Sequence, residues 1–144
     1  MISSLAISMG LREQIAEEAR KAYPNECCGL IEGAREFENA RAFAVHPTRN
    51  VAKGADRFEI DPAEHIRLLR AARAAGHGII GCYHSHPNGS AEPSAADREN
   101  ASEDDFIWLI SAIGADQKPK LASFVYADGA FAPIRLARAK AAKV

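Results

Sequence analysis

Two histidines stand one residue apart at the end of an apolar stretch of the sequence. His84 and His86 close the segment GIIGCYHSH, and Pro87 follows them directly. Side chains two residues apart in a β-strand point to the same side. If this segment is a strand, both imidazoles face one point, and the proline places that point at the rim of a sheet.

A carboxylate follows at a short distance along the chain. Asp97 comes three residues after Ser94, and the stretch from Ser94 to about Ala101 is predicted as a short helix. The positive end of a helix dipole keeps a carboxylate in the first turn ionised. A His-x-His pair alone is often a surface feature, and Ser-x-x-Asp alone is close to a plain helix cap. Together, two imidazoles and a carboxylate are ligands that suit Zn²⁺, with water as a fourth ligand, and they predict a metal site.

Hydrolysis at such a site also needs a base and a group that stabilises an oxyanion. Glu26, in YPNECCGLIEG, lies where a predicted helix gives way to a strand. It can accept a proton from water and pass it to a leaving amine. Ser94 can offer its hydroxyl to the oxyanion while its backbone begins the helix. An ordinary loop glutamate fits the Glu26 position equally well, so spacing alone leaves its role open.

The composition is that of one globular domain, which we predict over residues 1–144. The chain is 47% hydrophobic and 26% charged, with a net charge of −1, so no strong field attracts nucleic acid or an anionic membrane. Neither a run of about 20 apolar residues nor a secretory signal pattern is visible. Three cysteines are an odd number, which favours free thiols in a reducing cytoplasm. We expect a cytoplasmic monomer or weak homo-oligomer.

Helices and strands alternate in the first half of the chain, which predicts an α/β fold with a mixed sheet. One helix is expected over residues 10–23. A second is expected over 61–76, with Asp61 and Glu64 forming a capping box. The polar stretch 47–56 is expected to be an exposed loop in which Asn50 or Lys53 contacts a partner. Strands are predicted at 4–8, 27–33, 36–45, 57–60, 78–86, 106–113, 121–127 and 130–137, with turns at Gly33 and at Asp128-Gly129.

The histidine segment resembles the signature of a known family. His84, Ser85 and His86, then seven residues, Ser94, two residues and Asp97 match the pattern of the JAB1/MPN/Mov34 metalloenzymes, the JAMM or MPN-plus domains. PNECCGLIEG is similar to that family's Pro-x-Glu-x-Cys-Gly segment. The resemblance implies an α/β/α sandwich around a curved mixed β-sheet, similar to the cytidine deaminases. The chain length is similar to that of the small prokaryotic stand-alone branch.

The resemblance also implies an activity and a role for each site residue. The expected enzyme is a zinc-dependent metallopeptidase or isopeptidase that cuts a peptide, isopeptide or amide bond at the C-terminus of a ubiquitin-like or sulfur-carrier protein. The family pattern assigns His84, His86 and Asp97 to one zinc ion whose bound water is the nucleophile. It assigns Glu26 to general acid/base catalysis and Ser94 to stabilising the tetrahedral intermediate.

Four alternatives stay open at this point. A cysteine hydrolase would use Cys82 or the Cys27-Cys28 pair. A nucleobase deaminase would normally show His-x-Glu and a later Pro-Cys-x-x-Cys, neither of which occurs. A non-catalytic module that binds ubiquitin-like proteins would carry only a structural metal. A RadC-like protein associated with DNA repair would share a stretch similar to HSHPNGSAEPSAAD.

Overall fold

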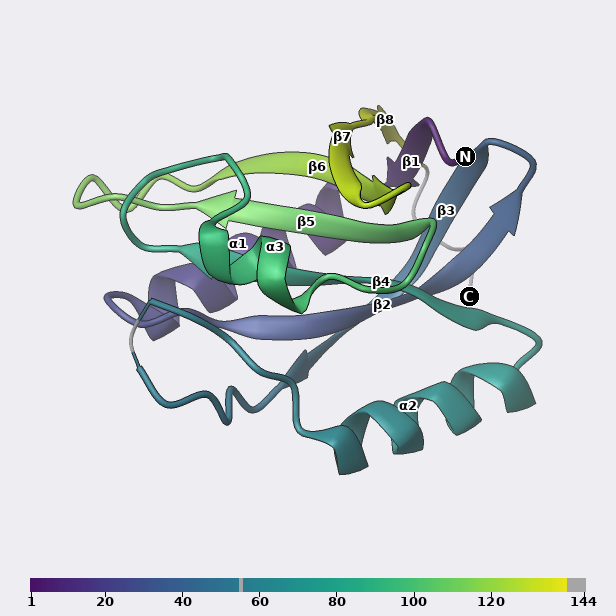
Figure 1. Ribbon diagram of the computed structural model, residues 1–144, viewed down its shortest axis with the longest axis horizontal. Helices are drawn as coiled ribbons and strands as arrows, with labels where there is room; N and C mark the ends of the chain where they lie inside the picture. Colours follow the sequence, from purple (N-terminus) through teal and green to yellow (C-terminus); the bar gives the residue numbers. More distant parts are fainter. Residues whose placement is uncertain (55, 140–144) are drawn as a thin grey trace.

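The computed structural model describes residues 1–54 and 56–139, and these form one mixed eight-stranded sheet with three helices (Figure 1). In chain order the elements are β1 (Ser4–Ile7), α1 (Met9–Ala22), β2 (Cys28–Glu36), β3 (Asn39–Thr48), α2 (Pro62–Ala74), β4 (Gly78–His86), α3 (Ala95–Asn100), β5 (Phe106–Ala112), β6 (Lys120–Ala127), β7 (Ala130–Pro133) and β8 (Arg135–Arg138).

The sheet is strongly curved. Its strand order is β7-β6-β5-β4-β2-β3-β1-β8; β4 pairs with β5 in parallel and with β2 antiparallel. Just before β8, the chain links the two ends of the sheet, because Ile134 donates its N–H to the Ser123 carbonyl and Arg135 donates to the Ser3 carbonyl. The sheet is therefore nearly closed, and the predicted α/β fold class is confirmed.

Helices cover both faces of the sheet, and a hydrophobic cluster lies under each. The α1 residue Ile15 belongs to one cluster together with Tyr83 of β4. The α2 residue Leu68 belongs to the other together with Cys82, the neighbour of Tyr83 in the same strand. Successive strand residues face opposite sides, so β4 contributes to both cores. Among the described residues, no helix has the length and apolar character needed to cross a membrane.

Strand β4 is the central element for the site, and its bounds are those predicted. All of its residues after Gly78 are buried. A continuous apolar run is typical of a strand covered on both faces. Pro87 has no N–H to donate, and the strand ends just before it. His84 and His86 consequently lie at the rim of the sheet.

The predicted turn at Gly33 is wrong. The turn between β2 and β3 lies at Phe37, whose φ is 57°, and Gly33 stays within β2. The pairing of β2 with β3 shifts by one residue between Glu32 and Gly33. A Cβ on Gly33 would collide with the carbonyl oxygen of Arg41. Glycine here serves a close approach of two backbones at a bulge.

Two predicted strands also differ from the structure. The segment 57–60 is not a strand: it makes only an isolated bridge between Ile60 and Asn50, and it packs on the core as a loop through Phe58. The segment 130–137 divides at Ile134 into β7 and β8, because β8 leaves β6 and pairs with β1.

The predicted capping box of α2 is only half present. Asp61 accepts the N–H of Ala63, as an N-cap should. Glu64 instead accepts the N–H of Arg49 and so holds the end of β3 against the helix.

The close packing of β4 against β5 gives a stability prediction. A Cβ on Gly81 would collide with the carbonyl oxygen of Ile107 and lie 2.9 Å from its Cβ. Gly81→Ala should lower the free energy of unfolding by about 1–3 kcal/mol. Gly78→Ala in the same strand is the control, because no heavy atom lies within 4 Å of its added Cβ, and its effect should stay within about 0.5 kcal/mol. Urea denaturation followed by circular dichroism measures both, and equal losses would contradict the packing argument.

Candidate metal centre

The two histidines of β4 face the same point, as the period of a strand predicts. Their Nε2 atoms lie 2.9 Å apart. The His84 side chain is fully buried and that of His86 is 5% exposed. Neither ring has room to turn away, so the strand presents two ring nitrogens to one small volume.

The start of α3 brings Asp97 to the same volume. Its Oδ2 lies 3.1 Å from the Nε2 of both histidines. Ser94 donates its N–H to that carboxylate at 2.9 Å, and its Oγ accepts the N–H of Asp97 at 3.1 Å. Ser94 and Asp97 therefore form a capping box, and the cap itself fixes the direction of the carboxylate. The cap is therefore compatible with a ligand role for this carboxylate.

The donor set fits a divalent metal ion. The three donor atoms are 2.9–3.1 Å apart, and the edges of a tetrahedral zinc site with nitrogen ligands are about 3.3 Å. His86 Nδ1 lies 2.9 Å from the Ser90 carbonyl oxygen, which accepts its N–H. That hydrogen bond leaves the lone pair on Nε2, the atom that faces the site.

Burial and hydrogen bonds give Asp97 and His84 the protonation states of ligands, whereas the pKa of His86 is shifted the other way. Burial tends to raise the pKa of Asp97, but hydrogen bonds to His84 and His86 and from the Ser94 backbone hold that pKa well below its usual range. Burial lowers the pKa of His84, which favours the neutral imidazole. Burial also tends to lower the pKa of His86, but the Asp97 hydrogen bond and the Ser90 carbonyl raise it overall.

Aromatic rings hold the His84 side chain. The Phe58 ring stacks on it at 4.2 Å and 25°, and Trp108 packs edge-on at 5.8 Å. Within the described residues, His84 Nδ1 has no hydrogen-bond partner, so packing orients this ring. Neither aromatic residue was expected at the site, since Phe58 and Trp108 fall only within the predicted strands 57–60 and 106–113. No local pattern could reveal the stacking, since it depends on the path of the loop that carries Phe58.

Glu26 lies beside the two histidines, just before β2. Its carboxylate and the ring nitrogens of His84 and His86 lie within 4.8 Å of one another, and this buried group could hold a metal ion. The pKa of Glu26 is raised to about 7, chiefly by burial; the charge of His86 opposes this rise, and the charges of Asp97 and Asp56 add to it. The structure thus places two carboxylates beside one pair of imidazoles: Asp97, whose pKa is lowered, and Glu26, whose pKa is raised.

Ser85 fixes the backbone next to Glu26. It points to the other side of β4 from its two histidine neighbours, where its Oγ accepts the N–H of Cys27 at 2.8 Å. Its own N–H donates to the Cys27 carbonyl at 3.1 Å. In the antiparallel pairing, Cys28 of β2 lies opposite His84 of β4. Glu26 therefore comes to the histidine pair through the register of two adjacent strands.

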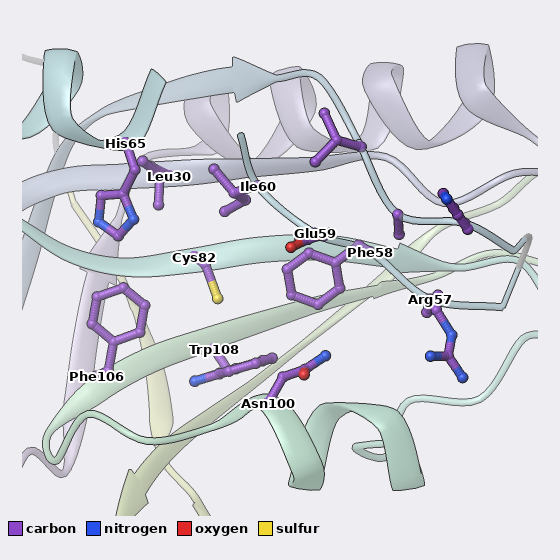
Figure 2. A pocket seen from close by; sticks show the side chains of 13 residues that line it. Leu30, Arg57, Phe58, Glu59, Ile60, His65, Cys82, Asn100, Phe106 and Trp108 are labelled. Atoms are coloured by element: carbon purple, nitrogen blue, oxygen red, sulfur yellow. The ribbon is translucent and has the colours of Figure 1, made fainter. Parts of the chain in front are cut away.

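One cavity opens at this centre, and a second lies on the other side of Phe58. One, of about 290 Å³, opens over Glu26, His86 and Ser94. The other, of about 610 Å³, lies beneath the loop that carries Phe58 and has Cys82 and Trp108 among its lining residues (Figure 2). Phe58 lines the larger cavity and stacks on His84, so the ring forms a wall between that cavity and the histidines.

Known proteins are similar to this chain in sequence and in fold. The chain is 36% identical over 113 residues to the Desampylase of Haloferax volcanii, covering 75% of this chain and 80% of that protein. It is 26% identical over 126 residues to the CysO-cysteine peptidase of Mycobacterium tuberculosis, covering 88% and 85%. A solution structure of a Desulfitobacterium hafniense protein is similar with a TM-score of 0.84 and 30% identity, covering 97% and 94%.

The family model for prokaryotic homologs of the JAB domain matches residues 8–126, which include every site residue discussed above. The resemblance predicted from the histidine signature is confirmed. The chain belongs to the prokaryotic JAB family.

Proposed function

We propose that this protein is a zinc-dependent metallopeptidase or isopeptidase. Its substrate would be a peptide, isopeptide or amide bond at the C-terminus of a ubiquitin-like or sulfur-carrier protein. The observation that carries the proposal is the convergence of His84, His86 and Asp97 beside the buried carboxylate of Glu26. The relatives support the class of reaction, since they are named Desampylase and CysO-cysteine peptidase.

We assign the metal to His84, His86 and Asp97. Asp97 is the better third ligand because its carboxylate lies 3.1 Å from both ring nitrogens and its pKa is held low. Glu26 has a raised pKa, which suits a group that gains and loses a proton. When bound, the zinc ion would polarise the scissile carbonyl and lower the pKa of a water molecule to about 7.

Two side chains would then carry the chemistry. Glu26 accepts a proton from the attacking water and gives it to the departing amine, so its carboxylate ends the cycle as it began. Ser94 already accepts the N–H of Asp97 through its Oγ, which leaves its hydroxyl proton free to donate to the oxyanion. Both residues line the smaller cavity, where the scissile bond would lie.

The carrier protein would reach this cavity through an extended C-terminal tail. The opening over Glu26 and Ser94 is small, and a narrow tail without bulky side chains would fit it best. We further propose a single catalytic domain over residues 1–144 that acts in the cytoplasm as a monomer or weak homo-oligomer. Its net charge of −1 supports partners other than nucleic acid or membrane.

Metal removal and thiol alkylation test the proposal together. The probe is CysO, the protein after which the CysO-cysteine peptidase is named, extended by one C-terminal cysteine. The measurement is the release of that cysteine. A chelator should abolish cleavage, and added Zn²⁺ should restore it. Iodoacetamide should leave the rate unchanged, because burial raises the pKa of Cys27 to about 11 and that of Cys82 well above its usual value. Cleavage that survives chelation, or that alkylation abolishes, would favour the cysteine hydrolase instead.

A further inference from the structure

The side chain of Asn50 joins the backbone of Glu26 to the loop over the larger cavity. We infer that Asn50 is a positioning residue for Glu26, an inference that rests on the proposed role of Glu26 as proton carrier. Asn50 follows β3 and lies outside both cavities' lining residues. It was expected to contact a partner; its carboxamide hydrogen-bonds to backbone groups of this chain.

All four hydrogen-bonding positions of the Asn50 carboxamide are used. Its Nδ2 donates to the Glu26 carbonyl at 3.2 Å and to the Arg57 carbonyl at 3.1 Å. Its Oδ1 accepts the N–H of Ala52 and that of Glu59, both at 3.0 Å. A primary amide offers two donors and two lone pairs, so this side chain is saturated by backbone groups alone.

The Asn50 bond to Glu26 adds to the backbone contacts that the pairing of β2 with β4 already provides next to it. The pairing of Ser85 with Cys27 fixes the residue after Glu26. Asn50 fixes the carbonyl of Glu26 itself. The backbone at Glu26 is therefore held from two segments: Ser85 lies in β4 within the histidine segment, and Asn50 lies just after β3.

The same carboxamide also fixes the ring that stacks on a histidine. Arg57 and Glu59 flank Phe58, and Asn50 bonds to the backbone of both. Figure 2 shows Arg57, Phe58 and Glu59 among the side chains that line the larger cavity. The Asn50 side chain thus fixes both the backbone of Glu26 and the position of the Phe58 ring on His84. A shift of about 1 Å at a reacting group can cost 100-fold in rate, so this placement bears directly on turnover.

Asn50→Asp removes the two hydrogen bonds that the carboxamide donates and keeps the two that it accepts. The carboxylate keeps the acceptor for Ala52 and Glu59, but it replaces the Nδ2 donor with an oxygen that faces the carbonyls of Glu26 and Arg57. Asn50→Ala removes all four hydrogen bonds. If Asn50 only closes the loop, any loss of turnover in the Asp variant should come together with exposure of the Ala52 and Glu59 amides. If it positions Glu26, the Asp variant should lose turnover while the loop stays closed.

The test measures turnover, zinc content and amide exchange on the same zinc-loaded proteins. For CysO extended by a C-terminal cysteine, Asn50→Asp should lower kcat by about 10- to 100-fold, with KM within about two-fold of the wild type. Each kcat is taken on the pH plateau of its variant, so that a changed ionisation of Glu26 does not enter. Zinc content should be unchanged, and the amides of Ala52 and Glu59 should stay protected in Asn50→Asp but not in Asn50→Ala.

Asn39→Asp is the matched control. Asn39 accepts the hydrogen bond of the Ser4 hydroxyl at 2.6 Å, and it lies at the turn of the β2–β3 hairpin, far from the histidines. The same chemical change there should leave kcat unaltered. In a Glu26→Gln background, Asn50→Asp should cause no further loss, because the group that it positions is already inactive.

The outcomes separate this inference from the proposed function. If Glu26→Gln turns over normally, the proton-carrier role is wrong and the inference falls with it. If Glu26→Gln is inactive but Asn50→Asp keeps its kcat, only the positioning role is wrong. Exposure of the Ala52 and Glu59 amides in Asn50→Asp, together with a lower kcat, would assign Asn50 to loop closure alone and would also overturn the inference.

Discussion

Replacing Glu26 by glutamine should leave zinc bound and slow turnover by about 10²- to 10⁴-fold, the usual contribution of a general acid/base. Glutamine has nearly the same shape as glutamate, so the 8% exposed side chain should still fit its place beside the histidines. A carboxamide cannot accept a proton from water at neutral pH or return one to an amine. The loss should therefore fall on kcat.

Glu92→Gln is the matched control for this experiment. Glu92 lines the same small cavity, but its side chain is exposed and no step requires it. Its kcat should stay within about two-fold of the wild type. In the wild type, turnover should rise with pH as Glu26 loses its proton. Burial raises its pKa to about 7 and a bound cation lowers it again, so the rise should lie at or below about pH 7. Normal cleavage by Glu26→Gln would refute its role.

The central part of the site could be predicted from local patterns. A continuous apolar run that stops at Pro87 defines the last strand before the histidines, and the period of two puts His84 and His86 on one side. The cap formed by Ser94 and Asp97 is equally local, because it depends on residues three apart. Each of these features needs only the neighbouring sequence, so the structure reproduces them.

The features that sequence analysis missed depend on contacts between distant segments. Phe58 reaches His84 only because the loop before α2 folds back over the sheet. Asn50 satisfies backbone groups of Glu26, Ala52, Arg57 and Glu59, and nothing in its neighbourhood distinguishes it from an ordinary loop asparagine. The break at Ile134 likewise follows from the pairing of β8 with β1, at the other end of the chain. Tertiary contacts override local propensity at each of these positions.

Replacing Asp97 by asparagine should weaken zinc binding by at least about 100-fold, since even partners that only support a ligand contribute 10- to 100-fold. The change removes the negative charge of Asp97 and leaves a single carboxamide oxygen as a weak ligand. The capping bond from the Ser94 N–H can persist on that oxygen, so α3 should still form. Competition with a chromophoric chelator measures the affinity. Zn²⁺ should raise the Tm of the wild type but not that of the variant.

Asp61→Asn is the control, because it makes the same change in a helix cap remote from the histidines and loses only an exposed ion pair with Arg49. The Asp97 and Glu26 variants then decide together which carboxylate holds the metal. Both carboxylates lie near the ring nitrogens of His84 and His86, but only the low pKa of Asp97 suits a permanent ligand. If Asp97→Asn kept its zinc and Glu26→Gln lost it, the ligand and the proton carrier would have to exchange places. If both variants lost zinc, both carboxylates would be ligands, and no side chain at this centre would be free to carry the proton.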